Sequence, residues 1–146
     1  MRLNGVGTDF LKGDTMDEVY DFLKKCGTYY VATIDGDWPR VRAFGTIHKF
    51  EDKLYIQSGR SKAVYKQILA NPHTEIIAFD NKDTWVRIDS TLVEDPRIEA
   101  EQALLDDYPS LAGRYAAGDG NNVVFYMKDA TATFSSFSGE SHTVEF

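Results

Sequence analysis

The sequence has a single cysteine, Cys26, and no run of the roughly 18 apolar residues that a membrane-spanning helix needs. One cysteine excludes an internal disulfide and a cysteine-rich metal cluster, and its position before Gly27 at the expected end of a helix favours a packed thiol. The amino-terminal residues lack the continuous apolar stretch of a signal peptide. No linker or low-complexity segment divides the 146 residues. We therefore expect one cytoplasmic domain spanning residues 1–146.

Basic residues are the minority, because 16 lysines and arginines stand against 23 acidic residues and the formal net charge is −7. Such a field repels phosphate backbones and anionic lipid, so neither nucleic acid nor a membrane is expected as a partner. The three histidines, His48, His73 and His142, lack the spacing of metal ligands, and no metal site is expected. The phosphate-binding loop of nucleotide hydrolases and the Rossmann glycine pattern are both missing. No residue shows the partner pattern of a catalytic acid, base or nucleophile.

Helix signals occur at three places. Thr15 and Glu18 match a capping box, in which each side chain satisfies a free backbone amide. Ser61 is a suitable cap for a second helix, and Pro96 suits the first turn of a third. The expected helices span residues 15–26, 61–70 and 95–107, with a short helical piece within 108–121.

The remaining segments are rich in β-branched and aromatic residues and are separated by turn residues. Hairpin turns are predicted at residues 35–37, 51–53 and 81–83. The expected strands are three within residues 28–58, one over 74–80, one over 84–94, and two final strands around Lys128 and Asp129. Six or seven strands with about three flanking helices predict a mainly β (α+β) fold, a compact antiparallel barrel whose closure hides the sheet edges.

Two nearby segments gather basic and hydroxyl side chains. If residues 40–47 form one strand, Arg40 and Arg42 share a face and stand about 7 Å apart, close enough for both to reach one phosphate. Phe44 shares their face, and Val41, Ala43 and Ile47 point to the other.

Ser61 and Lys62 lie at the predicted start of a helix, where free amides and the helix dipole favour an anion. Together with the arginines they predict a site for a phosphorylated ligand. Two plainer readings stay open: a solvated helix cap at Ser61, and an exposed edge strand whose charges prevent unwanted pairing at Arg40 and Arg42.

Taken together, the first helix, "PRVRAFG", "LYIQSGRSKAVYKQILANP", "TEIIAFD" and "TWVRIDSTLVE" resemble the pyridoxamine 5′-phosphate oxidase-like family of FMN-binding split β-barrels. The resemblance covers about residues 15–137 and is closer to the small members grouped with nitroimidazole-resistance proteins. It implies a split β-barrel and a homodimer with FMN at the subunit interface, both chains contributing to each site.

The resemblance also implies roles for individual residues. Strand 40–44 would lie against the flavin, Ser61 and Lys62 would bind its phosphate, and Trp85 would lie near the isoalloxazine ring. Whether Arg40 or Arg42 meets the phosphate is open, and Trp38 is a second candidate to border the ring. Core packing is the alternative role for both tryptophans. The implied cofactor-binding residues are Arg40, Val41, Arg42, Ala43, Phe44, Ile56, Gln57, Ser58, Ser61, Lys62 and Trp85.

Two departures from the family pattern bear on the substrate. Gly45 stands near a position that is basic in true oxidases. True oxidases also carry a further carboxy-terminal segment with arginine and histidine for the substrate phosphate, whereas this sequence ends at "SGESHTVEF", so pyridoxamine phosphate oxidation is not expected. Gln57 replaces the histidine of many nitroimidazole-resistance members, which argues against nitro-group reduction.

The leading hypothesis is an FMN-dependent oxidoreductase that uses NADH or NADPH and an unknown small-molecule acceptor. The alternatives are a flavin or heme protein for storage or sensing without turnover, and a structural dimer without cofactor. Lys24 and Lys25 are expected on a solvated helix face, where replacement has little effect.

Overall fold

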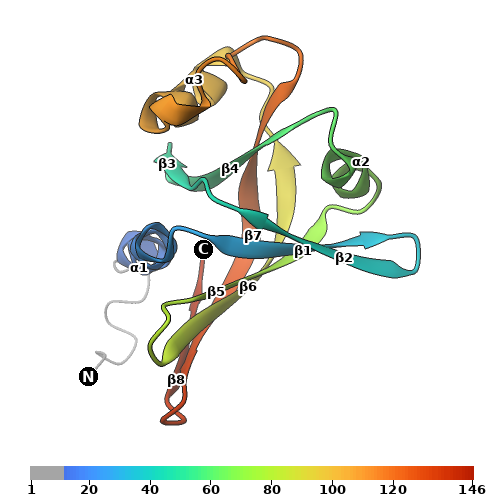
Figure 1. Ribbon diagram of the computed structural model, residues 1–146. Helices are drawn as coiled ribbons and strands as arrows, with labels where there is room; N and C mark the ends of the chain where they lie inside the picture. The colour runs from blue at the N-terminus through green and yellow to red at the C-terminus, as the bar shows by residue number, and fades with distance from the viewer. Residues whose placement is uncertain (1–11) are drawn as a thin grey trace.

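The computed structural model describes the backbone of residues 12–146 and the side chains from Met16 onward. Figure 1 shows a twisted sheet with helices at its margins. The elements are α1 (Lys12–Cys26), β1 (Tyr29–Asp35), β2 (Trp38–Phe44), β3 (His48–Phe50), β4 (Lys53–Gly59), α2 (Ala63–Ala70), β5 (His73–Phe79), β6 (Thr84–Glu94), α3 (Ile98–Asp107), a short 3-10 turn η1 (Pro109–Leu111), β7 (Asn122–Ser136) and β8 (Ser141–Glu145).

The strands form one antiparallel sheet in the order β2-β1-β5-β6-β7-β4-β3, and β8 pairs with β7. Long β7 pairs with β4 along its first part and with β8 along its last part. In Figure 1, α3 and the β3–β4 hairpin lie at one end of β7 and the β7–β8 hairpin lies at the other. The predicted mainly β split barrel with three helices is therefore confirmed, although the described residues form eight strands in place of the six or seven predicted. The strand order begins at β2 and ends at β3, and these two strands do not pair with each other. Backbone hydrogen bonds therefore do not close the sheet, as the predicted closed barrel would require.

The chain between Phe44 and His48 breaks the predicted run of three strands. Residues 45–47 leave the sheet, so β2 pairs with β1, whereas β3 pairs with β4 at the opposite end of the strand path. Four strands therefore replace the three predicted. The two hairpin turns within this region are confirmed, at Gly36–Asp37 and at Glu51–Asp52, where Glu51 and Asp52 both have positive φ.

The predicted turn at Lys128 and Asp129 is wrong. Both residues lie inside β7, where the pairing register with β6 shifts between Asp89 and Thr91. Asp129 has φ 52°, so it carries a local bend of the strand without reversing the chain. The actual reversal lies between β7 and β8, where Gly139 has φ 93°.

Helix starts were predicted less accurately than helix ends. Helix α1 begins at Lys12, three residues before Thr15, so Thr15 is inside the helix; its side chain, and with it the capping box, lies outside the described residues. Helix α3 begins at Ile98 with Arg97 at its cap, which leaves Pro96 outside the first turn. Helix α2 ends at Ala70 as predicted, because Pro72 disfavours helix at the residue before it.

The main core lies between the inner face of the sheet and helices α1 and α2. Fully buried side chains from both layers form it, including Val19, Leu23, Val31, Ile56 and Ile76. Cys26 packs against this core from the end of α1, and burial raises the pKa of its thiol. The predicted packed thiol is confirmed.

Candidate functional site

One cavity of about 300 Å³ lies where the ends of β2 and β4 meet the start of α2 and the segment after α3. Several predicted cofactor-binding residues line it: Arg42, Ala43, Phe44, Gln57, Ser58 and Lys62. The other lining residues are Gly45, Thr46, Tyr108, Ser110, Leu111, Arg114 and Tyr115.

The charged residues that line the cavity are all basic. Its lining carries Arg42, Lys62 and Arg114, and no acidic side chain among the described residues that form it. In a chain with a net charge of −7, this grouping creates a local positive potential that opposes the sign of the whole protein. Two of the three cations are arginines, whose planar guanidinium binds phosphate or carboxylate through paired hydrogen bonds. The cavity is chemically suited to an anionic group.

Arg42 is held in place without a carboxylate partner. Its guanidinium donates to the backbone oxygen of Val31 at 3.1 Å, to Thr33 Oγ1 at 2.7 Å and to Gln67 Oε1 at 2.6 Å. Burial and the neighbouring Arg40 charge lower the pKa of Arg42 from its usual range. A positive group that is desolvated and repelled by a second cation gains stability when an anion binds beside it.

Arg40 lies on the same face of β2 but has a different environment. In the β1–β2 register, Arg40 is opposite Thr33 and Arg42 is opposite Val31, so the predicted alternation is confirmed. The Arg40 side chain is exposed and pairs with Asp35 at 3.1 Å, and it does not line the cavity.

Lys62 is the cap residue of α2, with an extended backbone and no side chain capping the helix. The predicted capping by Ser61 is therefore wrong, because the helix begins one residue later than that cap requires. Ser61 is exposed and donates its backbone N–H to the side-chain oxygen of Asn121 at 3.0 Å. Lys62 lines the cavity and Ser61 does not.

The β4 residues divide between the core and the cavity wall. Ile56 is fully buried in the main core and does not line the cavity, whereas Gln57 and Ser58 do. The backbone N–H of Gln57 donates to Thr46 Oγ1 at 3.1 Å, which ties the wall to the segment that follows β2.

Neither tryptophan lines this cavity. Trp85 is partly buried and its ring centroid is 5.2 Å from that of Phe137, in an aromatic group that includes Phe79. Trp38 is 61% exposed, so it is not a core residue. Val41 also lies outside the cavity lining and is 67% exposed.

The segment after α3 supplies part of the wall that the sequence did not predict. The Tyr108 hydroxyl donates to the Ile47 backbone oxygen at 3.0 Å and accepts from the Ile47 N–H at 2.9 Å. It also accepts from Lys24 Nζ at 3.1 Å, and Lys24 pairs with Asp107 at 2.8 Å. Burial disfavours the Lys24 charge, but these hydrogen bonds outweigh it and raise the Lys24 pKa. The expected solvated role of Lys24 is therefore wrong.

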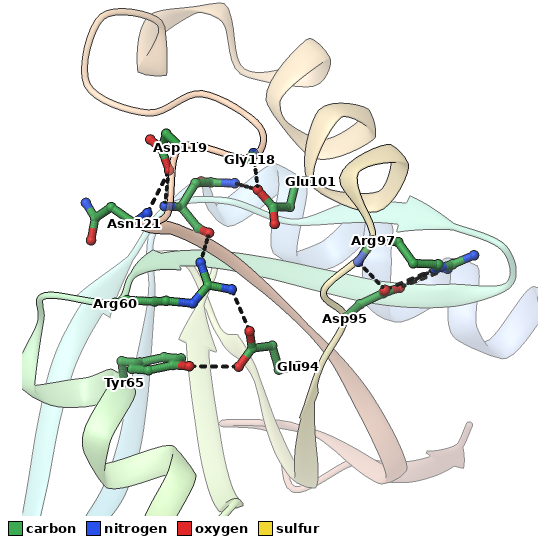
Figure 2. Close-up of polar contacts among 10 residues, drawn as sticks. Arg60, Tyr65, Glu94, Asp95, Arg97, Glu101, Gly118, Asp119 and Asn121 are labelled. Atoms are coloured by element: carbon green, nitrogen blue, oxygen red, sulfur yellow. Dashed lines mark hydrogen bonds and ion pairs between the residues drawn. The ribbon is translucent and has the colours of Figure 1, made fainter.

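A polar network fixes the same segment to β7 (Figure 2). The Asp119 carboxylate accepts from the backbone N–H groups of Ala116, Asn121 and Asn122. Arg60 donates to the Asn122 backbone oxygen at 2.7 Å and pairs with Glu94 at 2.6 Å. Arg60, which belongs to the basic segment of the sequence, is thus occupied in supporting the structure.

Among the described residues, no three histidine, cysteine, aspartate or glutamate side chains are grouped so that they could hold a metal ion. None of the helices in this part of the chain has the length and apolar character to span a membrane.

Comparison with known proteins adds to these observations. The family model described as pyridoxamine 5′-phosphate oxidase matches residues 15–128. The crystal structure of a NimC/NimA family protein from Clostridium acetobutylicum has 36% identity and a TM-score of 0.90, covering 98% of this chain and 100% of that one. No curated protein matches the sequence.

Two more distant structures share the fold alone. A heme binding protein from Mycobacterium smegmatis has a TM-score of 0.70 and 11% identity, covering 88% of this chain and 56% of that one. A FAD-binding protein from Mesorhizobium loti has a TM-score of 0.58 and 14% identity, covering 82% of this chain and 94% of that one. The matched residues 15–128 include every residue that lines the cavity. With that extent of match, the chain belongs to the pyridoxamine 5′-phosphate oxidase family.

Proposed function

We propose that this chain is an FMN-binding flavoprotein that acts as an oxidoreductase on a small molecule. The single observation that carries the proposal is the cavity of about 300 Å³ lined by Arg42, Lys62 and Arg114 and by no acidic residue among those described. A phosphate is the group that this donor set suits best. The bound flavin would supply hydride or electron transfer, and the chain would supply binding, orientation and electrostatics.

Arg42 and Lys62 are assigned to the cofactor phosphate. Arg42 presents a guanidinium whose protein partners are all neutral oxygens. Burial and the Arg40 charge lower its pKa, so an anion bound beside it would stabilise its charged form. Lys62 adds a point charge at the start of α2, where the helix dipole has its positive end. Arg40 already has Asp35 as a partner, so of the two arginines we assign Arg42 to the phosphate.

We also propose that the functional unit is a homodimer. Alternation along the β1–β2 hairpin places only apolar residues on its outer face: Tyr30, Ala32, Ile34, Pro39, Val41 and Ala43, here called the outer apolar face. Tyr30, Ile34 and Val41 are 47%, 43% and 67% exposed. A second copy covering this face would remove that apolar surface from water. It would also give Val41 and Trp85, which do not line their own cavity, a way to contribute to the partner's site.

The test is an absorption spectrum of the purified protein, followed by release and identification of the chromophore. Flavin bands and released FMN are expected, with bleaching by NADH or NADPH and recovery when an electron acceptor is added. If the protein binds FMN but neither NADH nor NADPH reduces it, the proposed oxidoreductase activity is contradicted, and a storage or sensing role is left. A colourless protein that FMN does not reconstitute would contradict the flavoprotein itself.

A heme protein is the second candidate, because the heme binding protein from Mycobacterium smegmatis shares the fold. Heme iron needs an axial ligand such as histidine. Within the described residues, no histidine lines the cavity, which favours flavin over heme. A Soret band in the spectrum would reverse this preference.

A further inference from the structure

The cavity wall contains one amide whose orientation is fixed by buried neighbours. Gln57 is 7% exposed and lines the cavity from β4. Its Nε2 donates to the Ser58 backbone oxygen at 3.1 Å and to Asn122 Oδ1 at 2.9 Å. Both hydrogens of the amide are thereby used within the protein.

The Gln57 side-chain oxygen, Oε1, is free to accept a hydrogen bond from a bound molecule. No hydrogen bond from a described residue reaches Gln57 Oε1, yet no buried side-chain nitrogen or oxygen among the described residues lacks a partner. The oxygen is therefore accessible, and the accessible space beside Gln57 is the cavity. The wall thus presents a hydrogen-bond acceptor at this point.

The orientation of the Gln57 amide is set by a series of hydrogen bonds. A backbone group stands at each end of this series. Asn122 is completely buried, and its Nδ2 donates to Glu101 Oε1 at 3.2 Å. Glu101 is 3% exposed, and the same oxygen accepts from the Gly118 N–H at 3.0 Å. Figure 2 shows Glu101 on α3 between Gly118 and β7. Because Gly118 N–H can only donate and the Ser58 oxygen can only accept, the series between them cannot reverse.

We infer that Gln57 is a specificity-determining residue that accepts a hydrogen bond from the bound molecule, and that Asn122 and Glu101 are positioning residues that fix this acceptor. The inference rests on the proposed function. For FMN, we assign the donor to N3–H, the one N–H group of the oxidised isoalloxazine ring. The site then selects ligands that carry a donor at that position and rejects those that do not.

The test compares the dissociation constants of FMN and N3-methyl FMN for the full chain. The unchanged protein should bind FMN roughly tenfold more tightly, since methylation removes the donor and leaves the Gln57 oxygen without a partner. Gln57→Met removes the acceptor, so the two flavins should bind it with equal affinity. Gln102→Met is the matched control: Gln102 is exposed on α3 and bonds only Asp106 among the described residues, so this variant should keep the tenfold preference.

Two changes at Glu101 test the positioning role. Glu101→Gln retains an oxygen for Gly118 and Asn122, so it should keep the preference for FMN. Glu101→Met removes that oxygen and frees Asn122 to turn, so the preference should fall to about twofold. Melting temperatures measured in parallel identify a variant that has lost its fold, and the Gln57→Met and Glu101→Gln results still decide the matter.

The outcomes separate this inference from the proposed function. If the unchanged protein binds FMN but does not distinguish N3-methyl FMN, the inference is wrong and the flavoprotein stands. A preference that persists in Gln57→Met would be steric and would also overturn it. If Glu101→Met keeps its fold and the full preference, the hydrogen bonds of Glu101 and Asn122 do not fix the acceptor. If the unchanged protein binds no FMN, the proposed function fails and this inference fails with it.

Discussion

The Lys24 ammonium on α1 donates a hydrogen bond to the Tyr108 hydroxyl at 3.1 Å and so joins the first helix to the wall of the cavity. The same ammonium pairs with Asp107 at 2.8 Å, and Tyr108 in turn holds both backbone groups of Ile47. Residues far apart in the sequence therefore share one hydrogen-bonded junction behind the site.

Replacing Lys24 with Ala should lower the free energy of unfolding by about 1 kcal/mol and weaken FMN binding several-fold. The expected cause is a less firmly held Tyr108. Urea unfolding and FMN titration measure the two effects. Lys25→Ala is the control, since Lys25 is exposed and its ammonium is 4.0 Å from Asp80. If the two variants have the same free energy of unfolding and the same FMN affinity, Lys24 does not hold Tyr108 as proposed.

Replacing Lys62 with Ala should weaken FMN binding by about 1.5–3 kcal/mol, the range for a hydrogen bond to a charged group. Lys66→Ala removes the same charge one turn further along α2, from an exposed residue outside the cavity lining, and should leave the dissociation constant nearly unchanged. Titration in low salt measures both. An unaltered affinity in Lys62→Ala would defeat the phosphate assignment.

The two arginines of β2 should differ. Arg42→Met removes a guanidinium that bonds Val31, Thr33 and Gln67, so it should weaken FMN binding more than tenfold and also lower stability. Arg40→Met breaks an exposed pair with Asp35 and should cost less than about 1 kcal/mol in either measurement. A larger loss of FMN affinity in Arg40→Met would reassign the phosphate to Arg40.

These pairs show where the sequence was sufficient and where it was not. The hairpin turn at Gly36–Asp37 and the alternation of Arg40 and Arg42 are local properties of neighbouring residues, and both were predicted. The end of β2 at Phe44 was not, because it depends on β3 pairing with β4 at the opposite end of the strand path.

The site was predicted in the same uneven way. Arg42 and Lys62 belong to segments with recognisable residue types, and the structure places both at one cavity. Tyr108 and Arg114 reach it only because α3 and η1 return the chain to Ile47 and β4. The two tyrosines and the arginine in "YPSLAGRY" are the one signal in that segment, and their residue types alone do not predict the cavity wall that they join.

Asp95 should make stability depend on pH. Hydrogen bonds from Arg97, aided by one from the Tyr55 hydroxyl at 2.8 Å, lower the pKa of Asp95 to about 2. A lowered folded-state pKa gives stability that is present above the ordinary value near 3.8 and is lost as the pH falls through about 2. Asp95→Asn should therefore lower the free energy of unfolding by roughly 2 kcal/mol at pH 7.

Urea unfolding at a series of pH values measures this contribution. The difference between the unchanged protein and Asp95→Asn should be constant above about pH 5 and shrink toward pH 2. Asp106→Asn, which removes an exposed carboxylate that accepts from Gln102, is the control variant measured alongside. A difference that does not change with pH would mean that the Asp95 charge is not what its partners stabilise.

Val41 tests the proposed dimer, because it is 67% exposed on the outer apolar face and lies opposite Ala32 in the register of the β1–β2 hairpin. Val41→Asp places a charge there. Burying an unpaired charge in an interface is unfavourable, so this variant should not form the dimer. Light scattering after size-exclusion chromatography should find two chains per particle for the unchanged protein and one for Val41→Asp. FMN affinity should fall when the dimer dissociates, because each site of the proposed dimer would draw on both chains. Leu69→Asp is the control: Leu69 is 59% exposed on α2, the helix whose Gln67 contacts Thr33 on the opposite face of β1.

Two outcomes would contradict the proposed dimer. If Val41→Asp stays dimeric, the interface does not lie on the outer apolar face. If the unchanged protein binds FMN as a single chain, the site does not need a partner.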